Sequence, residues 1–394
     1  MKHSKKIKKI LSLLFIGLIF AMLLSGLLNT LFFPDVVSEY ENRYANLLDE
    51  LSFSGYLDGS FQQSMDAALG DQVDLASTFK RLYNKVSSGI YRTLLQPFIS
   101  SDDMKNNYYA MKSGWIFGGD CLVTYPYGEE RMAALEHAAE NYNRVFASRP
   151  EVEFFMYYVE REMDINFATG EKPGFSRHFF ELLNLPADNK DAFSIDSFEQ
   201  YYETFYRTDH HWNNIGSYQA YTELHKLLRC EDAPLCPTGE RALGGKFNGS
   251  YARGDLSCYE EQFNAYSFDF PVMECRVDGN EIDNYGSQDY YLAVDMPMVS
   301  YGKFYGGDNG EVFYSSNRPE RENLLIIGDS YDNALIRLIA THFNDTYAVD
   351  PRDYEIYMHK PFSLDYYIDS FGVDKVLFLG NIDTLSSREF YLGE

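Results

Sequence analysis

The chain has 394 residues with 34 basic and 59 acidic side chains, a formal net charge of -25 at pH 7. Its 45% hydrophobic and 24% charged residues exclude collagen-like, low-complexity and wholly disordered chains. Residues 1–33 hold five lysines and no acidic residue, so the remainder has 29 basic and 59 acidic groups, a net charge of -30. Because nucleic-acid binding needs clustered Lys and Arg, this acidity argues against a nucleic-acid partner.

An uncharged, mostly apolar run from Ile10 to Phe33 follows these lysines. As a helix its 24 residues rise about 36 Å, enough to cross a hydrocarbon core of roughly 30 Å. A cleavable signal peptide has a shorter apolar stretch and a small-x-small site, and no clean Ala-x-Ala pattern occurs here. We therefore expect a single-pass signal anchor in the cell membrane. Its amino-terminal lysines keep that end cytoplasmic, which puts Pro34 to Glu394 outside.

The sequence predicts four segments. They are a basic cytoplasmic tail (1–9), a transmembrane anchor (10–33), a membrane-proximal helical segment (34–100) and a catalytic domain (101–394). Apolar residues at helical spacing in 41–51 and 74–86 favour helices in the third segment. The five cysteines are Cys121, Cys230, Cys236, Cys258 and Cys275. None has CxxC spacing, so a zinc ribbon is not expected, while free thiols and one or two disulfides both remain open.

Helix and strand alternate within the catalytic domain. A helix is predicted at 129–148 and an apolar strand at 152–159. The C-terminal part predicts strands at 324–327, 346–349 and 375–379, a turn at 328–330, and helices at 332–343 and around 364–371. This alternation indicates an α/β fold with a parallel sheet, right-handed crossovers and helices on both faces. Ligands bind beyond the carboxyl ends of such strands, where Asp329, Ser330, Asp350, Arg352 and Asn381 fall.

The first chemical motif is Gly328-Asp329-Ser330-Tyr331. A serine in the turn between a buried strand and a helix projects its hydroxyl from the sheet edge, near helix-start amides that can bind an oxyanion. Ser330 is therefore a candidate nucleophile. A plain N-cap is the alternative, since that is a common role for serine before a helix.

The second motif is Asp209-His210-His211-Trp212. If this segment is extended, Asp209 and His211 share one side and His210 faces the other. A carboxylate beside an imidazole fixes its tautomer and raises its basicity, as a serine nucleophile requires. Two alternatives remain: a metal site formed by Asp209 and the histidines, and a core histidine packed with Trp212. We see no further metal ligands at recognisable spacing, and expect no metal.

A third feature is Gly380-Asn381, directly after the last apolar strand. The Asn381 amide could donate a hydrogen bond to a tetrahedral oxyanion. Gly and Asn also end strands and form turns, so this pattern is weak by itself.

Together the motifs resemble the DHHW family, relatives of the alginate O-acetylation proteins that carry a circularly permuted SGNH-hydrolase domain. The family's naming motif is Asp209 to Trp212, continued by residues 213–221, and the Gly328 to Tyr331 block follows it. Further similar segments are 41–43, 56–61, 247–250 and 349–352. The resemblance implies a three-layer, flavodoxin-like fold, circularly permuted because the Asp-His pair precedes the serine.

Carried over residue by residue, the resemblance makes Ser330 the nucleophile, His211 the general base and Asp209 its orienting partner. The Ser330 amide and Asn381 are the expected oxyanion donors. Tyr331, Gly249 and Arg352 are further candidates for oxyanion or substrate contacts, with Gly249 standing in for an oxyanion glycine that no motif locates.

The function expected from these residues is transfer of an acyl group, most simply acetyl, to a cell-envelope or exported polysaccharide through an acyl-serine. The resemblance implies no cofactor, and an acyl donor supplied by a membrane-bound O-acyltransferase partner. An SGNH-type carbohydrate acetylesterase and a noncatalytic polysaccharide-binding or assembly protein are the alternatives. The net charge of -30 favours a neutral or modestly charged glycan, unless Arg207, Arg253 or Arg352 makes the site basic.

Overall fold

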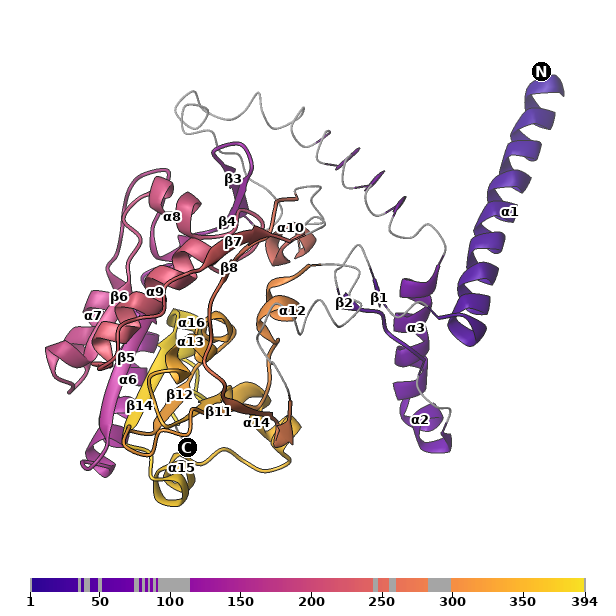
Figure 1. Cartoon of the computed structure of the whole chain (residues 1–394). Coiled ribbons are helices and arrows are strands. Elements are labelled where there is room, and N and C mark those ends of the chain that lie inside the picture. The colour runs from indigo at the N-terminus through magenta and orange to yellow at the C-terminus, as the bar shows by residue number, and fades with distance from the viewer. Residues whose placement is uncertain are drawn as a thin grey trace. The chain divides into compact units, whose positions relative to one another are not determined.

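A computed structural model describes residues 2–34, 37–38, 43–48, 52–73, 78–79, 82–83, 86–87, 90, 114–243, 247–254, 260–282 and 299–392. The chain divides into two compact units. One unit covers residues 1–98, and the other holds most of the chain from residue 99 onwards (Figure 1).

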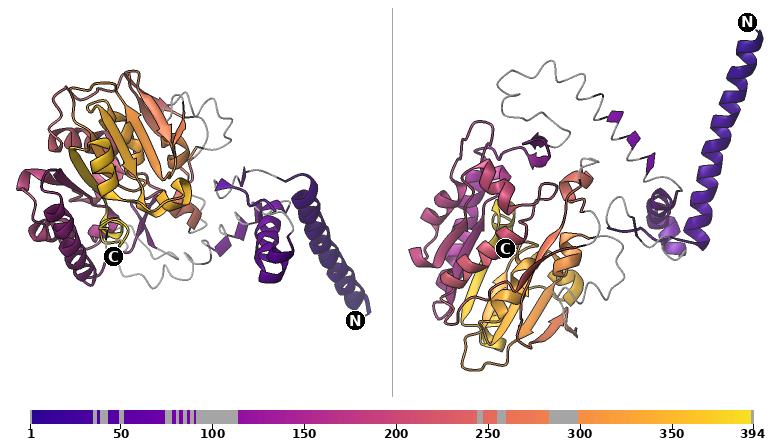
Figure 2. Two further views of the ribbon diagram at one scale, coloured as in Figure 1. Left: turned by 90° about the horizontal axis from the view of Figure 1, so that it is seen from below. Right: turned by 45° about the horizontal axis from the view of Figure 1, so that its top comes forward.

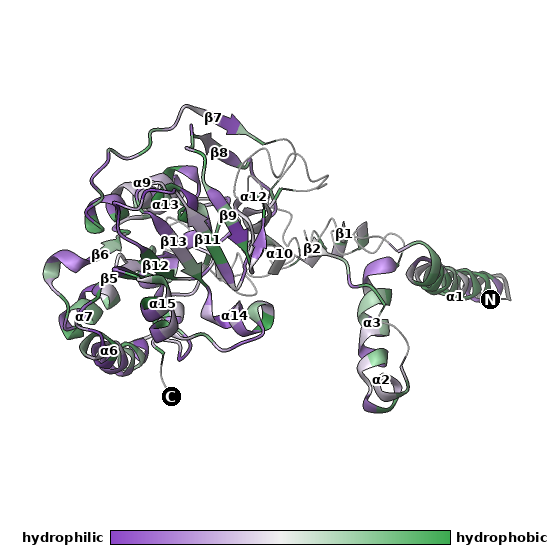
Figure 3. Cartoon of the chain, turned by 60° about the horizontal axis from the view of Figure 1, so that its bottom comes forward, coloured by the Kyte–Doolittle hydropathy of each residue, from purple (hydrophilic) through white to green (hydrophobic). Residues whose placement is uncertain are grey.

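The first unit contains the predicted apolar helix. Its elements are α1 (Lys2–Phe32), β1 (Val37–Ser38), β2 (Arg43–Tyr44), α2 (Phe53–Asp58) and α3 (Ser60–Gln72). Residues Lys6–Phe32 of α1 are long and apolar enough to cross a membrane, and their apolar side chains are largely exposed (Figure 3). The helix predicted at 41–51 is wrong for its described part, because Arg43–Tyr44 pair as a strand with Val37–Ser38. Most of the helix predicted at 74–86 lies outside the described residues.

The second unit is built on a central sheet with helices around it (Figure 2). The sheet has eight strands in the order β10-β9-β11-β13-β12-β14-β5-β6. Its strands are β5 (Glu153–Val159), β6 (Lys190–Phe193), β9 (Glu274–Val277), β10 (Asn280–Glu281), β11 (Glu311–Ser315), β12 (Leu324–Ile327), β13 (Asp345–Val349) and β14 (Lys375–Gly380). The five strands from β13 to β6 are parallel, as predicted. Strands β11, β9 and β10 extend this sheet with antiparallel pairings, which the sequence analysis did not anticipate.

Strand order shows the circular permutation directly. If the parallel strands are counted from β12, through the chain end and on to β5 and β6, their spatial order is 2-1-3-4-5. This is the flavodoxin-like order. The first parallel strand of the domain, β5, therefore pairs with the last strand, β14. The C-terminal segment also packs against α6 (Arg131–Ser148), the helix that precedes β5. The ring centroid of Tyr391 lies 5.7 Å from that of His137 and 6.4 Å from that of Tyr142.

Helices cover both faces of the sheet. One face packs against α9 (Asn214–Leu227) and α13 (Ile336–Ala340). The other packs against α6, α7 (Phe175–Leu182) and α15 (Leu364–Phe371). Alternate strand residues serve the two faces: Leu324 and Ile326 belong to the first core, Leu325 and Ile327 to the second. The fold is thus a three-layer α/β sandwich.

The remaining described elements are connections and small hairpins. They are β3 (Gly114–Phe117), β4 (Cys121–Thr124), η2 (Glu162–Asp164), η3 (Ala187–Asn189), α8 (Phe198–Thr204), β7 (Gly239–Ala242), α10 (Ser250–Gly254), β8 (Asn264–Ser267), α12 (Tyr301–Tyr305), η4 (Asp332–Ala334), α14 (Pro351–Met358) and α16 (Ile382–Leu385). The helix predicted at 332–343 is interrupted, because η4 and α13 share that stretch. The four described cysteines, Cys121, Cys230, Cys236 and Cys275, are free.

Replacing Phe378 with Ala tests the core behind the site. Phe378 is fully buried in β14, and its ring centroid lies 4.9 Å from that of Tyr142 on α6. The cavity left by this change should lower the free energy of unfolding by about 3 to 5 kcal/mol. Ile356→Ala, on the exposed side of α14, should change it by less than about 0.5 kcal/mol. Denaturant unfolding of the full chain in detergent measures both, and equal losses would contradict this packing.

Candidate active site

A tight loop between α8 and α9 carries the Asp-His motif. A β-bridge between Phe205 and Trp212 closes it, and the Tyr206 amide donates to the His211 carbonyl at 3.1 Å. The segment is bent and not extended, so the expectation that His210 faces away from His211 is wrong. Their ring centroids are 3.8 Å apart. The pairing predicted for Asp209 and His211 arises from this bend.

A chain of hydrogen bonds joins Asp209, His211 and Ser330. Nδ1 of His211 lies 2.6 Å from Oδ1 of Asp209, and Nε2 lies 2.8 Å from the Ser330 hydroxyl. With its proton on Nδ1, His211 donates to the carboxylate and offers the Nε2 lone pair to the hydroxyl. Asp209 and His211 are buried, whereas Ser330 is half-buried at the sheet edge. This arrangement can take a proton from a serine that a ligand can reach.

The Asp209 carboxylate is buried but well stabilised. Burial raises the pKa of Asp209, but the charges of His211 and His210 and hydrogen bonds from His211 and Ser250 hold this pKa well below its ordinary value. Its Oδ1 also accepts the His211 amide at 3.1 Å, and Oδ2 accepts the Ser250 amide at 2.6 Å. Asp209 is therefore ionised at neutral pH, as an orienting partner for an imidazole must be.

Gly249, a candidate oxyanion glycine, lies behind the carboxylate. Its amide donates to the Thr208 hydroxyl at 3.1 Å and so has a protein partner already. A Cβ at this position would come within 2.3 Å of the Thr208 carbonyl oxygen, so the chain needs glycine here to bring the Ser250 amide onto Asp209. The structure thus corrects the sequence interpretation: Gly249 supports Asp209 and has no free amide for an oxyanion.

Tyr331, predicted to contact an oxyanion or the substrate, is buried, with only 1% of its surface exposed. Its hydroxyl donates to the His210 carbonyl at 2.6 Å, and its ring packs on Trp212 with centroids 5.2 Å apart. Tyr331 therefore connects the serine turn to the loop that carries His210 and His211. We assign it the role of positioning this loop.

Tyr301 of α12 holds His211 from the other side. The two rings stack with centroids 3.8 Å apart and an interplanar angle of 6°. The Tyr301 hydroxyl accepts from the Trp212 indole at 3.2 Å and donates to the Tyr331 carbonyl at 3.4 Å. No motif marked this residue in the sequence, where it follows a stretch without recognisable pattern.

Ser330 and Asn381 follow neighbouring strands of the sheet. Ile327 pairs with Phe378, and each site residue lies three positions further along. The Ser330 amide donates to no atom among the described residues, so it can serve an oxyanion. The Asn381 side-chain oxygen caps α16 by accepting the amides of Asp383 and Thr384 at 2.8 and 3.3 Å. This capping fixes the Asn381 side chain, whose amide nitrogen is left to donate elsewhere.

Arg352 does not supply a free positive charge. Its guanidinium makes a two-point ion pair with the Asp350 carboxylate, one contact being 2.9 Å. Asp350 also lines a small pocket beside the serine turn, together with Asp308, Asp329 and Asp332. Burial and the charges of these neighbours raise the pKa of Asp332 well above its ordinary value. This side of the serine turn is therefore lined with carboxyl groups, of which Asp332 is held towards its neutral form.

Arg207, another cation near the motif, is also paired. Its guanidinium contacts Asp120 at 2.5 Å and Glu261 at 3.5 Å. Glu261 in turn accepts the Thr208 amide and hydroxyl, each at 2.7 Å, and so anchors the start of the loop. The side chain of Arg253 lies outside the described residues. Neither described arginine makes the site basic.

Arg161 and Glu162 form a buried cluster that sequence reasoning missed. They follow β5 at the same edge of the sheet, and Arg161 donates to the Tyr251 hydroxyl at 3.0 Å. Tyr251 donates to Glu162, and its ring lies 5.9 Å from that of His210. The Arg161 Nε is buried without a partner among the described residues. The sequence could have pointed to Arg161 and Glu162, because they closely follow a predicted parallel strand, at the sheet edge where ligands bind.

The alternative of a metal at the motif is less consistent with the geometry. Asp209, His210 and His211 could offer ligand atoms within 4.8 Å of one another. However, both ring nitrogens of His211 are engaged by protein atoms, Asp209 and Ser330. The hydrogen-bond chain therefore accounts for His211 without an ion.

The comparisons with known proteins concern the family and the fold. Residues 191–349 match the family model described as DHHW protein, a range that includes both the Asp-His loop and the serine turn. The resemblance to the DHHW family is confirmed. No curated protein gives a significant sequence match.

Solved structures with this fold include a DHHW family protein. Bacillus cereus PatB1 with a sulfonyl adduct aligns with TM-score 0.52 and 19% identity, over 69% of this chain and 94% of PatB1. A DHHW family protein from Eubacterium siraeum aligns with TM-score 0.51 and 16% identity, over 73% and 97%. The O-acetyltransferase domain of Pseudomonas putida AlgJ is more distant, with TM-score 0.39 and 11% identity over 68% and 90%. At these identities the first two alignments establish the shared fold.

Asp209→Asn tests the electrostatics of the loop through stability. The folded pKa of Asp209 lies below its unfolded value of about 3.9, so ionised Asp209 stabilises the fold above that pH and loses this effect as pH falls through the folded pKa. The free energy of unfolding lost in the variant should thus shrink as the pH falls below about 4. Urea titrations of the full chain in detergent measure it. The exposed control Asp269→Asn should differ from wild type by less than about 0.5 kcal/mol. A gap that grows as the pH falls below about 4 would contradict this assignment.

Proposed function

We propose that this chain is a membrane-anchored, extracytoplasmic O-acyltransferase. It transfers an acyl group, most simply acetyl, to a hydroxyl of a cell-envelope or exported polysaccharide. The observation that carries this proposal is the continuous hydrogen-bonded path from Asp209 through His211 to Ser330, with distances of 2.6 and 2.8 Å. The DHHW resemblance supports the choice of acyl transfer among the reactions open to such a path.

The first half-reaction loads the serine. His211 Nε2 accepts the Ser330 hydroxyl proton while Oγ attacks the carbonyl carbon of the acyl donor. The tetrahedral oxyanion accepts a hydrogen bond from the Ser330 amide and from the Asn381 side chain. When the intermediate collapses, the bond to the leaving group breaks, His211 returns a proton to that group, and an acyl-serine remains.

The second half-reaction unloads the serine onto the glycan. A sugar hydroxyl gives its proton to His211 Nε2 as its oxygen attacks the acyl carbonyl. Collapse of this second intermediate returns the proton to Ser330 Oγ and releases the esterified sugar. Asp209 stays ionised throughout and stabilises the imidazolium that forms in each half.

The anchor determines where the donor comes from. With lysines at its amino end, α1 leaves that end in the cytoplasm and the catalytic unit outside. Cytoplasmic acetyl-CoA cannot reach the serine there. The donor is therefore passed on by a membrane protein, for which the resemblance implies a membrane-bound O-acyltransferase.

The local charges favour an uncharged acceptor. Arg207 and Arg352 are both paired with carboxylates, so neither supplies a free positive charge for an anionic acceptor, and the chain beyond residue 33 has a net charge of -30. An anionic glycan would meet repulsion here, most strongly at low salt. We therefore expect neutral sugars to be better acceptors than uronic acids.

Replacing Ser330 with Ala tests the nucleophile. The purified full chain in detergent is incubated with p-nitrophenyl acetate, with and without chitopentaose as a neutral acceptor. Ser330→Ala should lower release of p-nitrophenol by about 1000-fold or more, because no acyl-serine can form. Ser148→Ala, at the exposed end of α6, is the matched control and should keep full activity.

Each outcome of that assay separates the candidate functions. Acetylated chitopentaose that depends on Ser330 supports transfer, whereas Ser330-dependent hydrolysis unchanged by the acceptor favours an acetylesterase. Glycan binding without turnover favours a noncatalytic binding protein. Full activity of Ser330→Ala contradicts the mechanism.

A sulfonyl fluoride tests activation of the serine independently of the acyl donor. PatB1 has been solved with a sulfonyl adduct, and an activated serine displaces fluoride to form such an ester. Phenylmethylsulfonyl fluoride should label Ser330 of the full chain, as read by mass spectrometry of its peptide. Labelling should fall about 100-fold or more in His211→Ala, which lacks the base. Equal labelling in that variant would show that His211 does not activate Ser330.

A further inference from the structure

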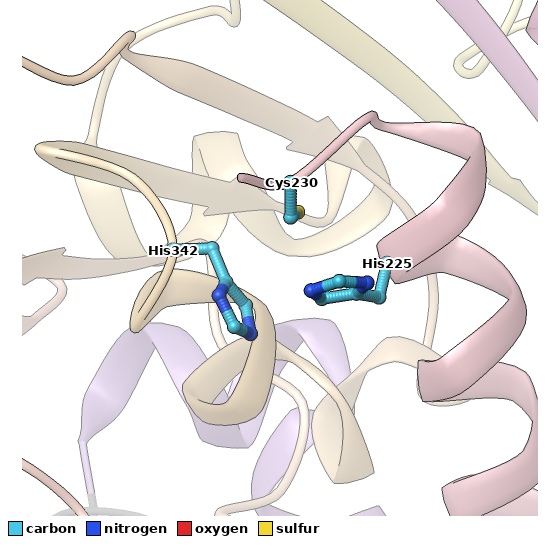
Figure 4. A group of neighbouring side chains, drawn as sticks. All are labelled: His225, Cys230 and His342. Atoms are coloured by element: carbon cyan, nitrogen blue, oxygen red, sulfur yellow. The ribbon is translucent and has the colours of Figure 1, made fainter. Parts of the chain in front are cut away.

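A second cluster of polar side chains lies between α9 and the segment that follows α13. His225 comes from the last turn of α9, Cys230 from the chain just after it, and His342 from two residues beyond the end of α13. One ligand atom from each lies within 4.8 Å of the other two. Figure 4 shows the three side chains converging from these segments. The mechanism proposed for Ser330 uses none of them.

The His342 ring is buried with an unmet hydrogen-bonding atom. The residue is 5% exposed, its Nε2 is 2.7 Å from the Tyr221 hydroxyl, and Nδ1 has no partner in the described part of the chain. Leaving a buried polar atom unpaired costs about 1 to 3 kcal/mol. Because a half-turn of an imidazole exchanges its nitrogen and carbon positions, either nitrogen can face the cluster.

The two imidazoles and the thiol are held in place by the protein. His225 Nε2 lies 2.6 Å from the Asp232 carbonyl oxygen, and the Cys230 amide donates to the His225 carbonyl at 3.0 Å. These contacts fix the His225 ring and the start of the segment that carries Cys230.

Positive charges around the cluster are balanced by carboxylates. Arg318 and Arg321 contact Asp232 at 2.7 and 2.8 Å. Lys375, which donates to the Leu228 carbonyl, pairs with Glu322 at 2.5 Å. A divalent cation at the cluster therefore meets no uncompensated positive charge from these groups.

We propose that His225, Cys230 and His342 form a zinc site. Two imidazoles and one thiolate are borderline-soft ligands of the kind that Zn²⁺ prefers, whereas Ca²⁺ and Mg²⁺ need oxygen ligands. Three protein ligands leave the fourth tetrahedral position to water. The Cys230 thiol proton passes to solvent as the Zn–S bond forms.

The site joins the two parts of the chain that carry the Ser330 machinery. Helix α9 begins three residues after His211, and α13 begins six residues after Ser330. A zinc ion bonded to both segments opposes their separation, so it stabilises the folded domain. The proposal does not rest on the proposed function, since a noncatalytic protein with this fold would hold the ion equally well.

Metal titration of the full chain in detergent tests the site. After treatment with EDTA and its removal, calorimetry with ZnCl₂ should show one ion per chain with micromolar or tighter affinity. Co²⁺ should give the intense visible bands of a tetrahedral ion and a near-ultraviolet thiolate-to-cobalt band. Zn²⁺ should also raise the unfolding temperature, because it binds the folded state.

Single substitutions assign the ligands. Cys230→Ser should lower zinc affinity at least tenfold and abolish the thiolate band, and His342→Ala should lower affinity similarly. Cys236→Ser, at an exposed cysteine outside the cluster, is the matched control and should bind as wild type does. If His342→Ala does not fold, the near-isosteric Cys230→Ser decides. Absence of stoichiometric binding by wild type, or a wild-type thiolate band in Cys230→Ser, overturns the proposal.

Discussion

The hydrogen bond between His211 and Ser330 is the contact on which the interpretation of this protein depends. It joins residues 119 positions apart, and the surrounding structure is arranged to hold it. Tyr331 ties the histidine loop to the serine turn through the His210 carbonyl, while Tyr301 stacks on the imidazole. The aromatic residues around the base therefore restrict the orientations of its ring. Such restriction keeps Nε2 directed at the Ser330 hydroxyl, as the proposed mechanism requires of the base.

The sequence predicted the parts of the fold whose local signals agree with their tertiary surroundings. Strand β12 and helix α15 have the predicted bounds, because their apolar patterns coincide with burial and Gly372 ends the helix in a left-handed conformation. The antiparallel edge strands were missed because β9 (ECRV) alternates charged with apolar residues and β10 consists of two exposed polar residues. Long-range contacts were beyond local reasoning as well. The sequence identified Asp209, His211 and Ser330 through motifs, but it could not show that Tyr331 is buried or that the Gly249 amide is occupied.

The net charge of the chain predicted which partners it would repel, but the sequence could not show which individual arginines are paired with carboxylates. The acidic composition predicts repulsion of anionic partners, and the structure shows why nearby arginines do not reverse it. Arg207 and Arg352 both contact carboxylates, so their charges are largely compensated. The turn at Gly328 also brings Asp332 close, since a Cβ at Gly328 would lie 2.3 Å from the Asp332 carboxylate. The side chain of Asp332 therefore packs against the serine turn. Its removal would change the geometry of the turn as well as the electrostatic potential around it.

The permuted strand order has a consequence for biogenesis. Strand β5 lies between β14 and β6, yet β14 is completed only at Gly380 of a 394-residue chain. During synthesis, one edge of the apolar strand β5 stays unpaired until β14, more than two hundred residues later in the chain, has been made. An unpaired apolar edge invites aggregation, and pairing of such distant segments is slow. The emerging polypeptide thus needs protection by folding factors until the last strand has closed the sheet.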